Sequence, residues 1–272
     1  MFLNIKFPEN VRVQIDKTPP TLDPVTARGV LWQAATERFL LVLPKVARYL
    51  VENGQQVTIQ PYPESNETEI EYFWQGTPLA ALLYQRNLLA LHASAVSGPK
   101  GAVIFTGDSG TGKSALLVEL LKRGWKMLSD DLTIIAFDEK GNLLVYPNIS
   151  KIYLWPDSFE KFEINSPSYQ SRRIALSMNG HTTSIPCILH SIYNLSISNQ
   201  NHIEAELLNG VNHFNILPSL LYNNRIANVL MDKSVLFRFT TTISKNMGLN
   251  LLKRPMKTWS VKNLADYVEK TE

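Results

Sequence analysis

The chain has 272 residues, enough for one large α/β domain or two smaller ones with their own cores. Hydrophobic residues make up 44% and charged residues 19%, and the net charge of +3 is too small to predict binding to nucleic acid or to a membrane surface. No apolar run approaches about 18 residues, and the first residues do not have the pattern of a signal peptide. Cys187 is the single cysteine, so a disulfide within the chain and a cysteine-based metal site are excluded, and we expect a cytoplasmic protein.

Residues 1–75 are predicted to form a β-rich N-terminal module. Strand-like alternation covers residues 2–7, 11–15, 38–43 and 56–60, with turn-forming residues between these runs. Residues 46–52 precede Asn53 and Gly54 and are predicted to form a short helix. The module holds no set of catalytic residues, so we interpret it as a structural cap or a partner-binding surface.

Residues 76–208 are predicted to form an α/β core, and residues 209–272 a helical part packed on it. The core begins with a helix at 77–86, and its predicted strands cover residues 88–96, 102–106, 125–129, 132–137, 142–146, 151–155 and parts of 185–208. Further helices are expected at 115–123, from residue 156, at 217–230, at about 232–247 and at 261–269.

A glycine-rich motif lies between the apolar strand at 102–106 and the helix at 115–123. It reads Gly107-Asp-Ser-Gly-Thr-Gly-Lys-Ser114 and matches the phosphate-binding pattern G-x-x-x-x-G-K-[ST]. Glycines allow successive backbone N–H groups to face a phosphate, and the helix N-terminus adds partial positive charge. Lys113 is predicted to contact the β- and γ-phosphates of ATP, and Ser114 to bind Mg²⁺. The predicted nucleotide-binding residues are Gly107, Asp108, Ser109, Gly110, Thr111, Gly112, Lys113, Ser114 and Ala115.

Asp130 and Asp131 follow a strand that we expect to pair with the strand before the glycine-rich motif. Ligands bind at the carboxyl ends of strands in open α/β sheets, so one carboxylate is predicted to bind Mg²⁺ and the other to accept a proton from a hydroxyl. A solvated turn is the alternative interpretation. His92 lies in the strand at 88–96 and could orient a carboxylate, although a single histidine in an apolar strand is more often a core residue.

These motifs together resemble the catalytic domain of the HPr serine kinase/phosphorylase family, within the phosphoenolpyruvate-carboxykinase-like class of P-loop enzymes. The resemblance includes Leu91–Val96, the glycine-rich motif, Lys122–Gly124 and Ser129–Asp131, and extends more loosely to Arg254-Pro255. It implies a P-loop mixed β-sheet core that uses ATP and Mg²⁺. It also implies that Asp131 is the general base, with His92 as its partner, Lys113 on the phosphates and Asp130 as a metal-binding carboxylate.

The glycine-rich family signature with a metal-binding glutamate has no counterpart after Asp131. Candidate replacements are Asp157 or Glu160 for the glutamate, and Arg172, Arg173 or Arg225 for a later catalytic arginine. The favoured function is an ATP- and Mg²⁺-dependent kinase for a hydroxyl, that of a serine in a protein or precursor peptide, and the resemblance suggests a homo-oligomer. The alternatives are a nucleotide-binding regulatory or scaffold protein with little turnover, and a small-molecule kinase or carboxykinase relative.

Overall fold

The computed structural model describes residues 9–148, 151–154, 156–163, 174–177, 180–208, 211–256 and 258–272. The chain divides into two compact units. The first comprises Met1–Leu91 and Ile216–Thr241, and the second comprises His92–Asn215 and Thr242–Glu272. The predicted boundaries at residues 76 and 209 differ from this division, because the helix at 77–86 packs on strands of the first unit and the C-terminal part contributes to both units. The strand predicted at residues 2–7 lies outside the described residues.

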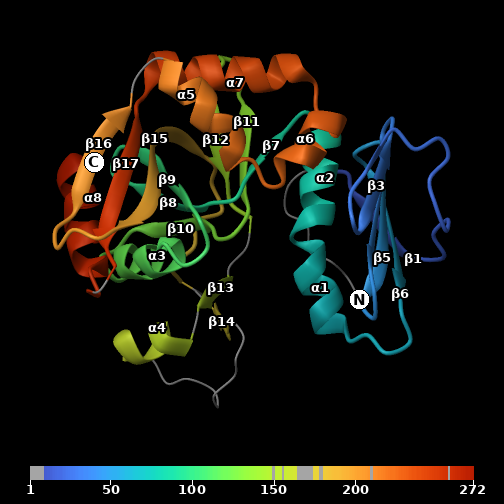
Figure 1. The fold of residues 1–272 in the computed structure, drawn as a ribbon, viewed down its shortest axis with the longest axis horizontal. Coiled ribbons are helices and arrows are strands. Elements are labelled where there is room, and N and C mark those ends of the chain that lie inside the picture. The colour runs from blue at the N-terminus through green and yellow to red at the C-terminus, as the bar shows by residue number, and fades with distance from the viewer. Residues whose placement is uncertain are drawn as a thin grey trace. The chain divides into compact units, whose positions relative to one another are not determined.

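The first unit contains a six-stranded sheet in the order β1-β6-β5-β4-β3-β2. Its strands are β1 (Arg12–Ile15), β2 (Ala27–Arg28), β3 (Trp32–Ala35), β4 (Arg38–Leu43), β5 (Ala47–Glu52) and β6 (Gln56–Pro61). The first strand runs parallel to β6, and the other pairs are antiparallel. Helices α1 (Glu67–Trp74) and α2 (Thr77–Gln85) lie beside the sheet (Figure 1). The predicted strands at 11–15, 38–43 and 56–60 are therefore confirmed.

The helix predicted at residues 46–52 is wrong, because this segment is strand β5. It pairs with β4 on one side and β6 on the other, so both of its edges are hydrogen-bonded within the sheet. The buried Tyr49 hydroxyl donates to the Ile70 carbonyl of α1 at 2.9 Å, and burial raises the pKa of Tyr49. Helix α1 itself was not predicted. It is capped by the preceding Asn66, whose side chain accepts a hydrogen bond from the Glu69 N–H at 2.9 Å.

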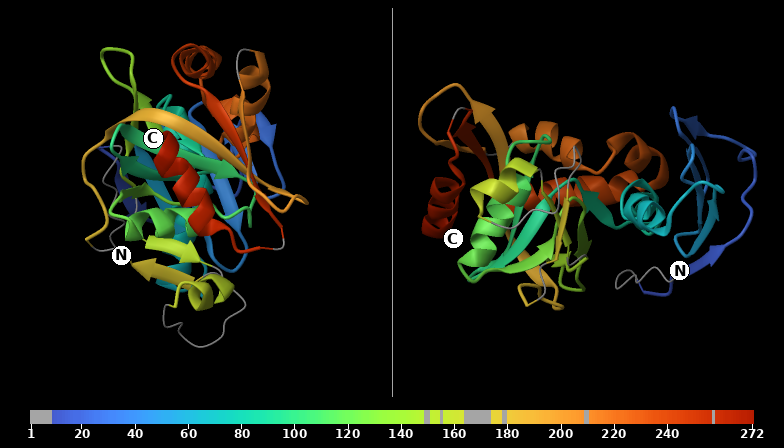
Figure 2. Two further views of the ribbon diagram at one scale, coloured as in Figure 1. Left: turned by 90° about the vertical axis from the view of Figure 1, so that its left-hand side faces the viewer. Right: turned by 90° about the horizontal axis from the view of Figure 1, so that it is seen from below.

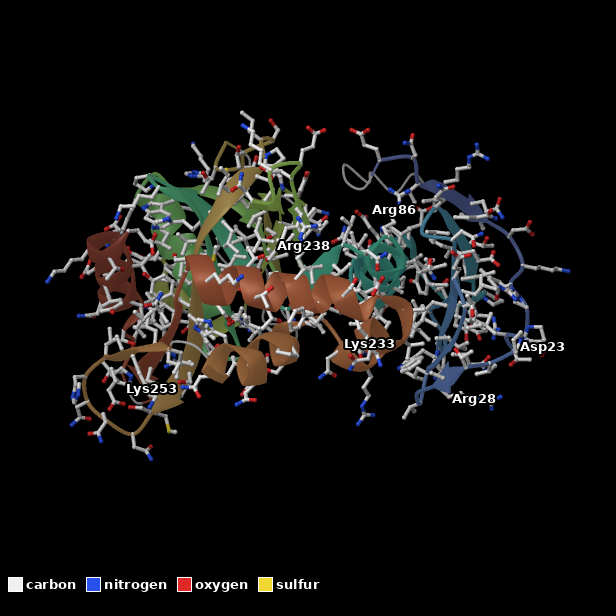
Figure 3. The ribbon with its side chains drawn as sticks, turned by 90° about the horizontal axis from the view of Figure 1, so that it is seen from above. Asp23, Arg28, Arg86, Lys233, Arg238 and Lys253 are labelled. Carbon is white, nitrogen blue, oxygen red and sulfur yellow. The ribbon has the colours of Figure 1, made fainter. Side chains whose placement is uncertain are left out.

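The end of α2 is tied to the sheet of the first unit by Arg86, which is labelled in Figure 3. Its guanidinium donates to the backbone carbonyls of Gly54 and, at 2.8 Å, of Glu9. Burial lowers the pKa of this guanidinium. The Gly54 N–H in turn donates to the Gln85 side chain at 2.7 Å. These contacts join the turn before β6 to the last turn of α2, so strand and helix are held together by polar as well as apolar contacts.

The second unit is built on a mixed sheet in the order β10-β8-β9-β15-β12-β11, with β17 also paired to β15, and β16 paired to β17. These strands are β8 (Ser94–Gly98), β9 (Gly101–Gly107), β10 (Lys126–Ser129), β11 (Thr133–Phe137), β12 (Leu143–Tyr146), β15 (Cys187–Ser198), β16 (Glu204–Leu208) and β17 (Leu249–Pro255). The hairpin expected from residue 132 to 146 is present as β11 and β12. A separate pair is formed by β13 (Lys151–Leu154) and β14 (Ile174–Ser177), and β7 (Leu89–Leu91) belongs to the first unit.

Strand direction brings several chain segments to one edge of this sheet. Strands β9 and β17 both run parallel to β15, and β8 is antiparallel to both β9 and β10. Strand β10 therefore runs in the same direction as β9. The carboxyl ends of β9, β10 and β17 consequently lie at the same edge, and β8 begins there.

Three sequence expectations about this sheet are corrected. Strand β10 does not pair with β9, because β8 lies between them. The strand predicted at 88–96 is two strands, β7 and β8, interrupted at His92 and Ala93. The C-terminal part is not wholly helical, since β17 is hydrogen-bonded along both of its sides, to β15 and β16.

Helices α3 (Lys113–Lys122) and α8 (Val261–Thr271) lie side by side on one face of this sheet (Figures 1 and 2). Their apolar faces share one core with β9, β15 and β17, which includes Phe105, Leu116 and Leu264. Arg123, at the end of α3, bonds to Asp266 and Glu269 of α8 at 2.7 Å each. The remaining helical segments are α4 (Pro156–Lys161), α5 (Val211–Ile216), the 3-10 turn η1 (Leu217–Leu220), α6 (Asn224–Leu230) and α7 (Lys233–Asn246). Within the described ranges, no helix combines the length and the apolar character that crossing a membrane requires.

Candidate functional site

The glycine-rich loop, residues 107–114, joins the carboxyl end of β9 to the first turn of α3. Its backbone has positive φ at Gly107 (127°), Gly110 (88°) and Gly112 (111°). L-residues with side chains rarely adopt these angles, so the loop needs glycine at these positions. A Cβ on Gly107 would also overlap the carbonyl oxygen of Leu195, its partner on β15. The strand, loop and helix expected from the sequence are therefore all present, and the glycines have a steric reason.

The Lys113 side chain lies against the backbone of this loop. Its Nζ donates to the carbonyl of Gly107 at 2.6 Å and to that of Asp108 at 3.1 Å, and the residue is 8% exposed. The Thr111 hydroxyl also donates to the Asp108 carbonyl, at 2.8 Å. A largely buried ammonium beside a helix N-terminus concentrates positive charge at the loop, and this charge favours an anion there.

A second cation reaches the loop from a distant part of the sequence. Arg254, at the end of β17, donates through Nε to the Thr111 carbonyl at 2.7 Å and through Nη2 to the Gly110 carbonyl at 3.0 Å. Burial lowers the pKa of Arg254, but a guanidinium stays charged in proteins. This arginine therefore braces the loop with two charged hydrogen bonds. Sequence reasoning gave it no role, because the segment before it was assigned to the helical part.

Asp130 is a buried carboxylate behind the loop. It is 1% exposed, and its Oδ1 accepts hydrogen bonds from the Ser94 hydroxyl at 2.6 Å and the Ser114 hydroxyl at 3.1 Å. One residue thus connects the end of β10 with the start of β8 and the first turn of α3. The sequence predicts Asp130 and Ser114 as ligands of the same Mg²⁺ but does not predict Ser94, whose contact depends on the antiparallel pairing of β8 and β10.

Asp131 has an unusual backbone conformation. Its φ is 67°, and the Leu132 N–H donates to the Asp130 carbonyl across it at 2.9 Å. Aspartate adopts positive φ more readily than most residues with side chains, and other non-glycine residues in turns of this chain also have positive φ. The Asp131 Oδ1 lies 3.7 Å from Nδ1 of His92, and both side chains are about one-third exposed, at 31% and 38%. The structure thus brings these two predicted residues together, and the approach is an ion pair when the histidine is protonated.

A pocket opens at this edge of the sheet in the second unit. Seven predicted site residues line it, and they are Gly110, Gly112, Lys113, Ser114, Ala115, Asp130 and Asp131. Arg254 also lines it, together with residues of β13, α4 and the start of α8. Cationic groups, two carboxylates and a helix N-terminus therefore face one space, as binding of a phosphorylated ligand requires.

The oxygens of Ser114 and Asp130 fit the chemistry of a magnesium site. Mg²⁺ prefers oxygen ligands at about 2.1 Å in octahedral geometry, so neighbouring ligand oxygens lie about 3.0 Å apart. The two side-chain oxygens here are 3.1 Å apart. Such ions usually keep waters and phosphate oxygens as further ligands, so two protein oxygens suffice. Among the residues that the structure describes, three or more His, Cys, Asp or Glu side chains do not cluster into a metal-binding group.

The other predicted residues have varied positions. Asp108 and Ser109 are exposed on the loop. Asp157 and Glu160 are exposed on α4, and the residue of α4 that lines the pocket is Ser158 between them. Arg225 is exposed on α6 and belongs to the first unit. Arg172 and Arg173 lie outside the described residues.

Comparisons with known proteins show neither a family nor an activity for this chain. No family model matches it, and no curated protein matches it. Among solved structures, it is similar to an Hpr(Ser) kinase/phosphatase from Coxiella burnetii, with 13% identity and a TM-score of 0.34 over 66% of this chain and 91% of that chain. A similarity of this degree assigns neither a family nor an activity. The sheets and helices of the structure itself make the chain a mixed α/β protein.

Proposed function

We propose that this protein is a kinase that uses ATP and Mg²⁺ to phosphorylate a hydroxyl group, that of a serine in a protein or precursor peptide. One observation supports this most strongly. Asp131 lines the same pocket as Lys113 and Ser114, so a carboxylate faces the space next to a glycine-rich loop. Phosphoryl transfer to an alcohol needs these two parts together, since a loop alone serves binding or hydrolysis equally well.

The loop and its cations would bind and orient the nucleotide. Backbone N–H groups of the loop and the Lys113 ammonium would hold the β- and γ-phosphates. Ser114 and Asp130 would hold Mg²⁺, which supplies positive charge to the phosphates when it is bound. Arg254 would keep the loop in its binding conformation through its bonds to two loop carbonyls.

Asp131 would act as the general base. Its carboxylate accepts the proton of the acceptor hydroxyl while the acceptor oxygen forms a bond to the γ-phosphorus. The bond from that phosphorus to the β,γ-bridging oxygen breaks, and ADP leaves with the bridging oxygen. His92, 3.7 Å away, is placed to orient this carboxylate.

The test is transfer of labelled γ-phosphate to candidate peptides and proteins by the full chain and by Asp131→Asn. Asparagine also tolerates positive φ, so the substitution removes charge and leaves the backbone conformation accessible. Loss of the base should lower transfer by about 10²- to 10⁴-fold and leave the affinity for ATP within a few-fold. Glu139→Gln, an exposed carboxylate in the β11–β12 turn, is the matched control and should transfer normally. Unchanged transfer by Asp131→Asn would remove this residue from the proposed role. ATP binding by the wild type without transfer to any acceptor would favour the regulatory alternative.

A further inference from the structure

Part of the pocket lining is apolar, and the most exposed of its apolar side chains is Trp259. Leu154 from β13 and Val261 and Leu264 from α8 line the pocket and are each less than 5% exposed. Trp259, just before α8, also lines it. Phosphate and Mg²⁺ gain nothing from such a surface, since apolar side chains offer them no hydrogen bonds or ligands. The lining therefore fits a ligand that has a phosphate end and an apolar, flat end.

The Trp259 ring is held in place by its neighbours, with the Lys161 ammonium over one face, and remains partly exposed. Phe162 packs edge-on against it with the ring centroids 5.5 Å apart, and the Lys161 ammonium lies 4.7 Å from its centroid. The residue is still 38% exposed. A tryptophan fixed by its neighbours in a pocket wall is suited to stacking on a heteroaromatic ring, because every nucleobase presents a flat π-face.

Ser260 has a buried hydroxyl that lacks a partner within the described part of the chain. The residue is 5% exposed, lines the pocket, and precedes the first residue of α8. A serine here commonly accepts a bond from a backbone N–H of the first turn, but with φ −113° and ψ 16° this hydroxyl makes no such bond. A buried, unpaired hydroxyl is destabilising, so a ligand that supplies its partner gains affinity.

We infer that Trp259, Ser260 and the apolar residues beside them form the subsite for the base of a nucleotide whose phosphates lie at the glycine-rich loop. The base stacks on the face of Trp259 opposite the Lys161 ammonium. The Ser260 hydroxyl turns about its χ1 angle from its buried position and hydrogen-bonds to a polar edge atom of the base. This inference rests on the proposed function and adds a recognition element to it. The phosphate donor is selected as a nucleoside triphosphate, and an inorganic polyphosphate is not an equivalent ligand.

The experiment compares two probes, Mg-ATP and Mg-tripolyphosphate, which share the triphosphate but differ in the nucleoside. Calorimetry on the full chain should give weaker binding of tripolyphosphate to the wild type. Trp259→Leu should weaken ATP binding by about tenfold to a hundredfold, the effect of losing one stacked base, and change tripolyphosphate binding less than about twofold. Trp259→Phe keeps a ring for stacking and is the matched control, expected within about fivefold of the wild type.

Ser260→Ala separates a ligand contact from a structural one. It should weaken ATP binding by about threefold to tenfold, the effect of one neutral hydrogen bond, with tripolyphosphate binding unchanged. Its melting temperature without ligand should not fall, because no internal hydrogen bond of the hydroxyl is lost. A fall of several degrees would instead show a structural role and overturn the assignment of Ser260.

The two failures can be told apart. Equal binding of ATP and tripolyphosphate by the wild type, or equal weakening of both by Trp259→Leu, overturns the base subsite and leaves phosphate binding at the loop intact. Binding of neither probe by the wild type refutes the proposed function, and the base subsite with it.

Discussion

Replacing Arg254 by methionine tests whether a strand distant in sequence maintains the glycine-rich loop. The change keeps an unbranched side chain but removes the guanidinium, which donates to the Thr111 carbonyl at 2.7 Å and the Gly110 carbonyl at 3.0 Å. Hydrogen bonds from charged groups contribute about 1.5–3 kcal/mol each when they are buried. Arg254 is only half-buried and Gly110 is exposed, so water can replace part of this interaction and we expect about 1–2 kcal/mol for the pair.

If this free energy holds the loop in its binding conformation, the affinity of Arg254→Met for Mg-ATP should fall by about 5- to 30-fold. Calorimetry measures the affinity, and hydrogen exchange of the amides of residues 107–112 reports the opening of the loop. Arg254→Lys keeps the charge but has no planar fork to reach both carbonyls, so its affinity for Mg-ATP should lie between those of the wild type and Arg254→Met.

The neighbouring Lys253 provides the control. It lies on the same strand, β17, where it is labelled in Figure 3, and successive side chains of a strand point to opposite faces of the sheet. Lys253→Met should therefore leave both measurements unchanged. The reasoning would be refuted if Arg254→Met showed wild-type exchange at the loop together with wild-type affinity for ATP.

Two further predictions concern glycine geometry and one carboxylate. Gly107→Ala would place a methyl group against the backbone of β15 and should destabilise the protein by more than about 3 kcal/mol, whereas Gly110→Ala meets only open space and should cost about 1–2 kcal/mol of backbone strain. Thermal unfolding of both variants measures the difference, and a lower melting temperature for Gly110→Ala than for Gly107→Ala would contradict the prediction. The Asn142 side chain hydrogen-bonds to the Asp138 carboxylate and holds the pKa of Asp138 below its usual 3.8. The ionised Asp138 therefore stabilises the fold above about pH 4, and this stabilisation is lost as the pH falls through the lowered pKa. In carboxyl NMR titrations, Asn142→Ala should raise this pKa toward 3.8, and an unchanged pKa would exclude the bond as the cause.

The parts of the site that the sequence predicts correctly are each defined by a local sequence pattern. The glycine-rich loop is set by glycines that permit φ values of 127°, 88° and 111°, and by a strand and a helix directly on either side. Asp130 and Asp131 follow a short, largely buried strand, and the end of a strand can be read from the chain itself. The nucleotide and metal roles of the loop and the two aspartates remain predictions, but these residues lie at one edge of the sheet, as expected.

The parts that sequence reasoning missed depend on pairing between distant segments. Residues 46–52 precede a turn and could form a short helix, and they are a strand because β4 and β6 bond to both edges. Residues 249–255 have weak alternation, and their parallel pairing with β15 makes them β17. Ser94 and Trp259 follow the same rule, since the sequence predicted no role for either and each reaches the pocket region through packing.

The sequence by itself determined that a glycine-rich turn with Lys113 and Ser114 opens a helix, because backbone sterics and nearest neighbours decide that structure. The tertiary structure alone decided which groups surround this turn. Asp130 bonds to Ser94 because β8 separates β9 from β10, and Arg254 reaches the loop because β17 runs parallel to β15. These contacts join residues 36 and more than 140 positions apart. No local periodicity encodes them, because their geometry is fixed only when the strands pair.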